Sequence, residues 1–212
     1  MVCVMRYKKT GKMLGKNLEE VKKGRKYNVA APNGSLICPI WFKKIKPYVD
    51  GIAVVQGKKN IFSRTQWGIL DIYGIVTWIS GEYENVIALT RNLIAVQEKV
   101  KKGQKGAWGL VDKNNIVICK PKYDKCPEWI IKGEFLMAQV CCQITILDNA
   151  GRQLCKPQYT SLRNAYRDER ESGIICEGIR NGYWYKINNK GVELKTGYHE
   201  SARVIKTGKR YY

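Results

Sequence analysis

The chain contains two nearly matching segments 41 residues apart, Trp67-Gly68-Ile69-Leu70-Asp71 and Trp108-Gly109-Leu110-Val111-Asp112. Three weaker copies continue the series at similar steps: Tyr27-Asn28-Val29-Ala30-Ala31, Ile144-Thr145-Ile146-Leu147-Asp148 and Trp184-Tyr185-Lys186-Ile187-Asn188. Self-similarity at a period of about 40 residues is the signature of repeat architectures, in which each unit packs on its neighbours. We expect the tryptophan to fill the gap between neighbouring units and the glycine to allow close backbone approach.

A turn residue follows each copy at the same offset. Seven residues beyond the start of each copy stands Gly34, Gly74, Asn115, Gly151 or Gly191. Glycine and asparagine tolerate positive φ, so a tight turn is predicted at each position. Asp71, Asp112 and Asp148 directly precede the turns, and we expect their carboxylates to accept turn N–H bonds. A metal or catalytic role is the alternative, which repetition disfavours because chemistry needs such a residue only once.

Two further apolar runs follow the aromatic segment. The second run is Leu36–Pro39, Ile118–Pro121 or Leu154–Pro157, and the third is Gly51–Val55, Leu93–Val96, Phe135–Ala138 or Gly173–Cys176. Short runs of this kind between turn residues indicate strands. The sequence therefore predicts an all-β fold of about five tandem antiparallel β-meander repeats of three strands, with a fourth where Val86–Leu89 and Trp129–Ile131 precede the third run. A β-propeller-like ring and an open curved array both remain possible.

The ends of the chain depart from the repeat. We predict that residues 1–26 form an N-terminal strand, Val2–Met5, and a basic insertion, and that residues 27–212 form the array, with a single domain overall. In the insertion, Leu14, Leu18 and Val21 are spaced i, i+4 and i+7, which predicts a short basic helix ending near Gly24. A solvated basic loop is the alternative. Residues 163–172 are predicted to be an exposed loop, and Ala202–Ile205 a last strand.

These units resemble the WG-repeat family of bacterial and phage proteins, whose units run Trp-Gly, a hydrophobic pair, Asp, a glycine turn, an apolar strand, then Pro and Tyr. The segment from Trp108 to Tyr123 follows that order best, and Trp67 to Gly74 follows its first half. The other copies match only by spacing. The resemblance covers roughly residues 27–207. It implies an all-β repeat array, with no defined catalytic activity or cofactor.

The charge of the chain is strongly positive and unevenly placed. The 212 residues carry 38 Lys and Arg against 18 Asp and Glu, a net charge of +20. Residues 1–49 hold twelve basic and two acidic side chains, which is half of that charge. The last twelve residues add Arg203, Lys206, Lys209 and Arg210 without an acid. A polyanion is the expected partner of such a surface, and charge that only maintains solubility is the alternative.

Several functional classes lack sequence support. The eight cysteines include no Cys-x-x-Cys pair; Cys38, Cys119 and Cys155 share one repeat position, as small buried hydrophobic residues would. His199 is the single histidine, so histidine triads are not expected. We therefore predict no enzyme, no cofactor and no metal site. No run of 18 apolar residues occurs and the first residues do not resemble a signal peptide, so a cytoplasmic protein without a membrane-spanning helix is predicted.

The favoured function is non-enzymatic recognition of nucleic acid, or of a nucleic-acid-bound protein complex, by the basic N-terminal region. Its candidate contact residues are Lys22, Lys23, Arg25, Lys26, Lys43, Lys44 and Lys46. Trp41 and Tyr48 flank the last three lysines and are candidates for base stacking. One alternative is a protein-binding scaffold, such as a phage-type inhibitor or accessory subunit that engages an acidic partner. Another is attachment to anionic lipid through residues 8–26.

Overall fold

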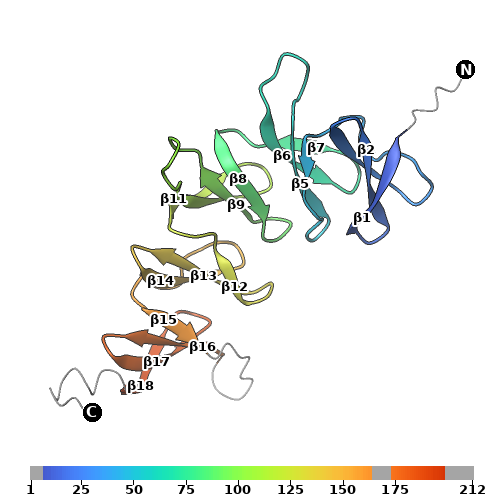
Figure 1. Cartoon of the computed structure of the whole chain (residues 1–212). Helices are drawn as coiled ribbons and strands as arrows, with labels where there is room; N and C mark the ends of the chain where they lie inside the picture. Colours follow the sequence, from blue (N-terminus) through green and yellow to red (C-terminus); the bar gives the residue numbers. More distant parts are fainter. Residues whose placement is uncertain (1–6, 164–172, 199–212) are drawn as a thin grey trace, which may run out of the picture. The chain divides into compact units, whose positions relative to one another are not determined.

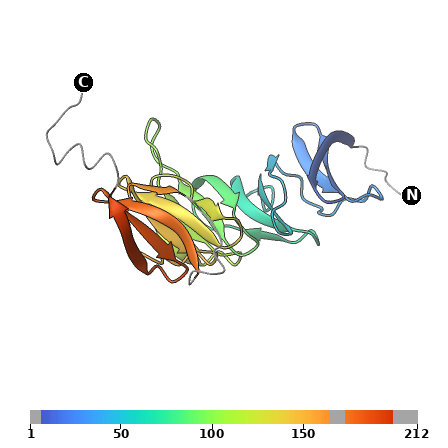
Figure 2. The ribbon, with the colours of Figure 1, turned by 90° about the horizontal axis from the view of Figure 1, so that it is seen from below.

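The computed structural model describes residues 7–163 and 173–198 of the chain. These residues contain no helix, and their strands form five small antiparallel sheets (Figures 1 and 2). The predicted all-β fold of antiparallel meanders is therefore confirmed. No sheet formed by the described residues closes into a barrel. By its internal contacts the chain divides into two compact units, Met1–Ile118 and Cys119–Tyr212.

Unit 1 holds sheets 1 and 2 and sheet 3 as far as Ile118; the remainder of the last strand of sheet 3 is counted with unit 2. Sheet 1 has the order β1-β2-β3, with strands β1 (Lys8–Gly15), β2 (Leu18–Lys23) and β3 (Lys26–Ala30). Sheet 2 consists of β4 (Lys44–Ile45), β5 (Ile52–Gly57), β6 (Gln66–Asp71) and β7 (Val76–Trp78), in chain order. Sheet 3 consists of β8 (Tyr83–Ala88), β9 (Ile94–Glu98), β10 (Trp108–Val111) and β11 (Val117–Tyr123). Pro121 lies on the edge strand β11, and edge strands are the sheet positions at which proline is tolerated.

Unit 2 holds the other two sheets. Sheet 4 consists of β12 (Glu128–Ile131), β13 (Phe135–Val140) and β14 (Gln143–Asp148). Two isolated bridges, Ile144 to Tyr159 and Leu147 to Gln153, place the following segment beside β14. Sheet 5 consists of β15 (Ser161–Arg163), β16 (Ile174–Arg180), β17 (Tyr183–Asn188) and β18 (Glu193–Tyr198).

Strand pairing corrects the predicted boundaries of the repeat. Each third apolar run pairs with the aromatic strand of the following copy, as β5 does with β6 over six residue pairs. The second and third runs fall in different sheets, because Ile118–Pro121 lies in β11 of sheet 3 and Phe135–Ala138 lies in β13 of sheet 4. The expected pairing between these two runs is therefore wrong. In sheets 2 to 5, the third run of one copy is therefore followed by the opening segment of the next copy. The boundaries of the sheets do not coincide with the boundaries of the sequence repeats.

The helix predicted within residues 8–26 is wrong, and so is the loop alternative. The segment forms the hairpin β1–β2 and continues into β3. Positive φ values at Asn17 (61°) and Gly24 (60°) mark the two connecting turns, so Gly24 ends a strand instead of a helix. Leu14 and Val21 are buried, as a helix would also require. Three apolar positions were too few to separate the two periodicities, and pairing with β3 decides for strands.

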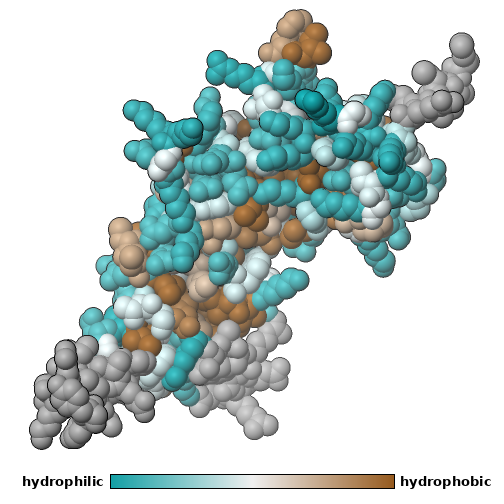
Figure 3. Space-filling view, viewed as in Figure 1, coloured by the Kyte–Doolittle hydropathy of each residue, from teal (hydrophilic) through white to brown (hydrophobic). Residues whose placement is uncertain are grey.

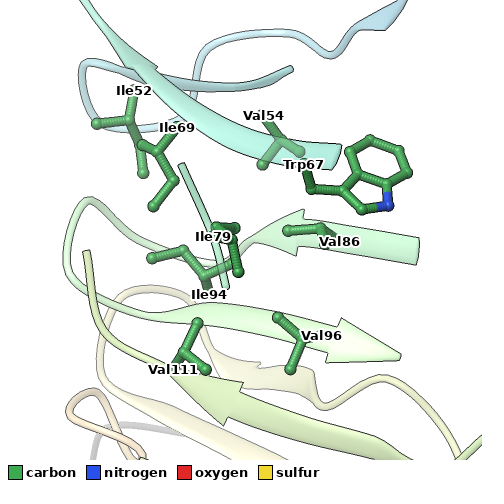
Figure 4. Close-up of a cluster of buried hydrophobic side chains, with 9 residues drawn as sticks. All are labelled: Ile52, Val54, Trp67, Ile69, Ile79, Val86, Ile94, Val96 and Val111. Carbon is green, nitrogen blue, oxygen red and sulfur yellow. The ribbon is translucent and has the colours of Figure 1, made fainter. Parts of the chain in front are cut away.

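The core of unit 1 lies between neighbouring sheets. Ile52 and Val54 of β5 join Trp67 and Val86 in one cluster between sheets 2 and 3 (Figure 4). Ala53 and Val55 point to the opposite face and belong to a cluster shared with sheet 1. Burial on both faces explains why the first four residues of β5, Ile52 to Val55, are all apolar. Within unit 2, a third cluster joins Ile146 of sheet 4 with Cys176 and Ile187 of sheet 5.

Trp67 fills the gap between two sheets, as the sequence predicted. Its side chain is buried, and its Nε1 donates to the carbonyl oxygen of Tyr83 in sheet 3 at 3.0 Å. The indole therefore contributes apolar area and satisfies its one N–H across the junction. Gly68 accommodates a different ring: an added Cβ would lie 3.0 Å from Cε3 of Trp78 on β7.

All five predicted turn residues have positive φ. The angles are 81° at Gly34, 86° at Gly74, 67° at Asn115, 81° at Gly151 and 75° at Gly191. The preceding carboxylates cap these turns as expected, since Oδ1 of Asp71 accepts the N–H groups of Tyr73 and Ile75 at 2.9 Å each. Asp112, Asp148 and Asn188 make the same pair of bonds in their own turns. The repeated aspartates are therefore structural.

Some predictions concern residues outside the described part of the chain. These are the strands at Val2–Met5 and Ala202–Ile205, residues 164–172 of the expected loop, His199 and the four basic residues near the C-terminus. The described residues include no helix that could cross a membrane.

Candidate functional site

Backbone pairing brings three basic segments of unit 1 together. Tyr27 of β3 and Phe42 exchange two N–H···O bonds of 2.8 Å, which sets Lys26 beside Lys43. The N–H of Lys43 in turn donates to the carbonyl oxygen of Gln56 at 2.7 Å, next to the end of β5. The β2–β3 turn, the segment before β4 and the loop after β5 therefore meet.

A pocket of about 640 Å³ opens where these segments meet. Four of its lining residues are cationic: Arg25, Lys26, Lys43 and Lys58. The other described lining residues are neutral, and they include the half-buried indole of Trp41 and the side chain of Ile61. Among the residues that the structure describes, none contributes a carboxylate to the pocket lining. The site therefore combines clustered positive charge with a flat aromatic surface.

The nearby acidic residues do not neutralise this cluster. Glu19 pairs with Lys9 at 2.8 Å and Glu20 with Lys12 at 3.6 Å, on the hairpin β1–β2. The hydrogen bond to Glu19 raises the pKa of Lys9. Within residues 7–163 and 173–198, none of the four pocket cations forms an ion pair with a carboxylate. Like charges held together by the backbone repel one another, and a bound anion relieves that repulsion.

The remaining predicted cations lie outside the pocket. Lys22 and Lys23 are exposed at the end of β2, and the ammonium of Lys22 lies 5.6 Å from the ring centroid of Tyr27. Lys44 is exposed on β4. These three side chains can extend a basic surface beside the site, but they do not line it.

Lys46 has an internal role. Its Nζ donates to Oδ1 of Asn85 at 2.7 Å and to the carbonyl oxygen of Val86 at 2.6 Å. The same ammonium lies 5.4 Å from the ring centroid of Trp67. Because these partners belong to sheets 2 and 3, the half-buried lysine joins the two sheets.

The two candidate stacking residues also separate. Trp41 lines the pocket, whereas Tyr48 packs against the cluster between sheets 1 and 2, with an added Cβ at Gly15 lying only 3.2 Å from its Cβ. The Tyr48 hydroxyl donates to the carbonyl oxygen of Asp71 at 3.3 Å, and burial raises its pKa. Tyr48 is therefore a packing residue.

Reasoning from sequence missed the third wall of the pocket. Lys58, Asn60, Ile61 and Thr65 come from the loop between β5 and β6. The signal was present in Gly57-Lys58-Lys59-Asn60, a basic turn-forming stretch. It lies just beyond the basic N-terminal 49 residues, and only the pairing of β4 with β5 brings it to the site.

The cysteines are largely explained by packing. Cys38 and Cys176 are buried and Cys155 is half-buried; burial raises the pKa of all three thiols, to about 12 for Cys176. Cys119 is half-buried, while Cys141 and Cys142 are exposed at a turn. In the part of the chain that the structure describes, no three His, Cys, Asp or Glu side chains are placed to hold a metal ion.

Comparison with known proteins adds no relative: no protein-family model matches the chain, and no curated protein matches it. The candidate site therefore rests on its own geometry.

Proposed function

We propose that this protein binds nucleic acid, free or within a nucleoprotein complex, through the basic pocket of unit 1 and acts as a non-enzymatic recognition protein. The observation that carries the proposal is the pocket itself, where Arg25, Lys26, Lys43 and Lys58 meet around the indole of Trp41 and no described lining residue is acidic. Phosphates provide the affinity in such an interaction, and aromatic side chains hold the bases.

The rest of the fold serves as a scaffold in this proposal. We propose that the sequence repeats are of the WG-repeat type. The turn geometry recurs at all five predicted positions, and the tryptophan of β6 bridges two sheets. The repeated aspartates accept turn N–H bonds through Oδ1, which supports a structural role for them.

The proposal predicts that neutralising the pocket weakens binding. In the variant R25Q/K26Q/K43Q/K58Q, affinity for a fluorescein-labelled 12-nucleotide strand should fall at least about tenfold at 0.15 M salt, because four phosphate contacts are lost. Fluorescence anisotropy measures the affinity. The matched control is K101Q/K102Q/K105Q/K113Q, which removes the same charge from exposed lysines of unit 1 outside the pocket. Its affinity should stay within about threefold of the unmodified protein, since only long-range attraction changes.

Equal losses in the two variants would show that binding follows net charge and not the pocket. A protein partner gives a different result: material captured from a lysate would survive nuclease treatment. Capture that nuclease abolishes supports direct binding of nucleic acid.

A further inference from the structure

The loop between β5 and β6 presents two apolar side chains to solvent beside the basic pocket. Ile61 is 80% exposed and Phe62 is 91% exposed. Figure 3, viewed as in Figure 1, shows a hydrophobic tip that protrudes from a hydrophilic surface where the loop between β5 and β6 lies. Exposure of a large apolar side chain forgoes the stabilisation that burial normally provides, so a protruding pair calls for an explanation.

The loop is held in this form by its own hydrogen bonds. Oδ1 of Asn60 accepts the N–H of Phe62 at 3.1 Å and the hydroxyl of Ser63 at 2.7 Å. The carbonyl oxygen of Asn60 accepts the N–H of Ser63 at 3.2 Å. The turn therefore presents the two side chains without using them in the core.

The apolar tip is no part of the repeat. The corresponding connections are Gly24-Arg25 in sheet 1, the basic stretch Lys101–Gly106 in sheet 3, Cys141-Cys142 in sheet 4 and Asn181-Gly182 in sheet 5. None of these places a large aliphatic or aromatic residue at its tip. Packing of the array thus does not account for Ile61 and Phe62.

Position and charge indicate the kind of partner. Ile61 also lines the basic pocket, so the tip and the four cations form one continuous surface. Lys59 adds a further exposed cation beside the tip. A partner that fits this surface carries anionic groups and flat apolar faces at close spacing. Single-stranded nucleic acid does so, whereas a duplex hides its base faces in the stack.

We propose that Phe62 stacks on an unpaired base of a single strand whose phosphates lie in the pocket, which makes the site selective for single-stranded nucleic acid. This inference rests on the proposed function and adds the strand state that the site recognises. A flat anionic membrane is less suited to the surface, because it cannot fill the pocket that adjoins the tip.

The test compares a labelled 12-nucleotide single strand with the duplex of the same sequence, using F62A. The single strand should bind the unmodified protein at least about tenfold more tightly than the duplex does. The F62A variant should bind the single strand about tenfold or more weakly than the unmodified protein, with no change in its affinity for the duplex. The salt dependence of F62A should equal that of the unmodified protein, because no phosphate contact is removed. The control is Y73A, which removes an aromatic side chain that is 76% exposed and lies outside the pocket, and it should leave both affinities unchanged.

Each contrary result has a distinct meaning. Equal affinity for strand and duplex, or an F62A variant that binds the strand normally, would overturn the inference and leave the proposed function intact. Loss of binding to phosphatidylserine vesicles in F62A, with normal binding of the strand, would assign the tip to a membrane. If neither nucleic acid binds the unmodified protein at 0.15 M salt, the proposed function fails together with the inference.

Discussion

The second residue of the repeated segment makes different contacts in different copies. Gly68 admits the ring of Trp78. Asn28 replaces the glycine in the first copy, and its buried amide donates to the carbonyl oxygens of Cys38 at 2.7 Å and Ile40 at 3.1 Å. Thr145 does the same in the fourth copy, with a 2.5 Å bond to the carbonyl oxygen of Cys155. Copies that lost the dipeptide thus retain the contact with the following segment.

The turn glycines also make contacts between sheets. An added Cβ at Gly74 would lie 1.6 Å from the carbonyl oxygen of Ile37, and one at Gly191 would lie 2.4 Å from that of Leu154. Both contacts join a turn to the segment 37 residues earlier in the chain. Glycine is therefore required at these positions for two reasons: the backbone has a positive φ, and a carbonyl oxygen lies where a Cβ would stand.

We predict that Gly74→Ala is far more damaging than Gly103→Ala. Both residues have positive φ, at 86° and 91°, but nothing lies within 4 Å of an added Cβ at Gly103. The G103A variant should lose about 1 kcal/mol of unfolding free energy from backbone strain alone. G74A should lose at least about 2 kcal/mol more, because a backbone carbonyl must move.

Urea unfolding followed by tryptophan fluorescence measures this difference, since Trp41, Trp67, Trp78 and Trp108 all report on unit 1. Similar midpoints for the two variants would argue against the contact between Gly74 and Ile37.

At the scale of elements, two hairpin turns have the same backbone conformation but different residues, and only one of them uses the residues that this conformation favours. The β16–β17 turn uses Asn181 (φ 49°) and Gly182 (φ 77°), the residues that a two-residue turn with two positive φ values favours. The β13–β14 turn has the same positive angles, 48° and 65°, at Cys141 and Cys142. Nothing in the structure explains why cysteines occupy this turn.

The double variant C141N/C142G should therefore raise the free energy of unfolding by about 1 kcal/mol, because it relieves the strain of two left-handed cysteines. The reciprocal variant N181C/G182C is the control and should lower it by about the same amount. Differential scanning calorimetry detects both changes. A destabilised C141N/C142G protein would mean that the cysteines make contacts that offset their strain.

At the scale of the whole molecule, the repeat period was sufficient to predict the all-β class and the five turns. The repeat period could not locate the sheet boundaries. The strand Ile52–Gly57 pairs with β6, the next strand in the chain, and this choice of partner depends on tertiary packing. The segment at residues 8–23 was misjudged because three apolar residues fit a helix as well as a hairpin.

The site was predictable only in part. Charge and composition predict Arg25, Lys26, Lys43 and Trp41 as members of the candidate site, and the structure brings all four to one pocket. Lys46 and Tyr48 belong to the same basic and aromatic stretch of sequence, but their side chains contact neighbouring sheets and do not line the pocket. Lys58 and Ile61 reach the site only through pairing of β4 with β5, which no local pattern announces.

The measurement that tests the central claim most directly is the salt dependence of single-strand binding, compared between the unmodified protein and R25Q/K26Q/K43Q/K58Q. Each phosphate contact on a single strand contributes about 0.7 to the slope of log K against log salt, so loss of four contacts should reduce the slope by up to about three. The control variant K101Q/K102Q/K105Q/K113Q should keep the slope of the unmodified protein. An unchanged slope in the pocket variant, or an equal reduction in the control, would contradict nucleic-acid binding at this pocket.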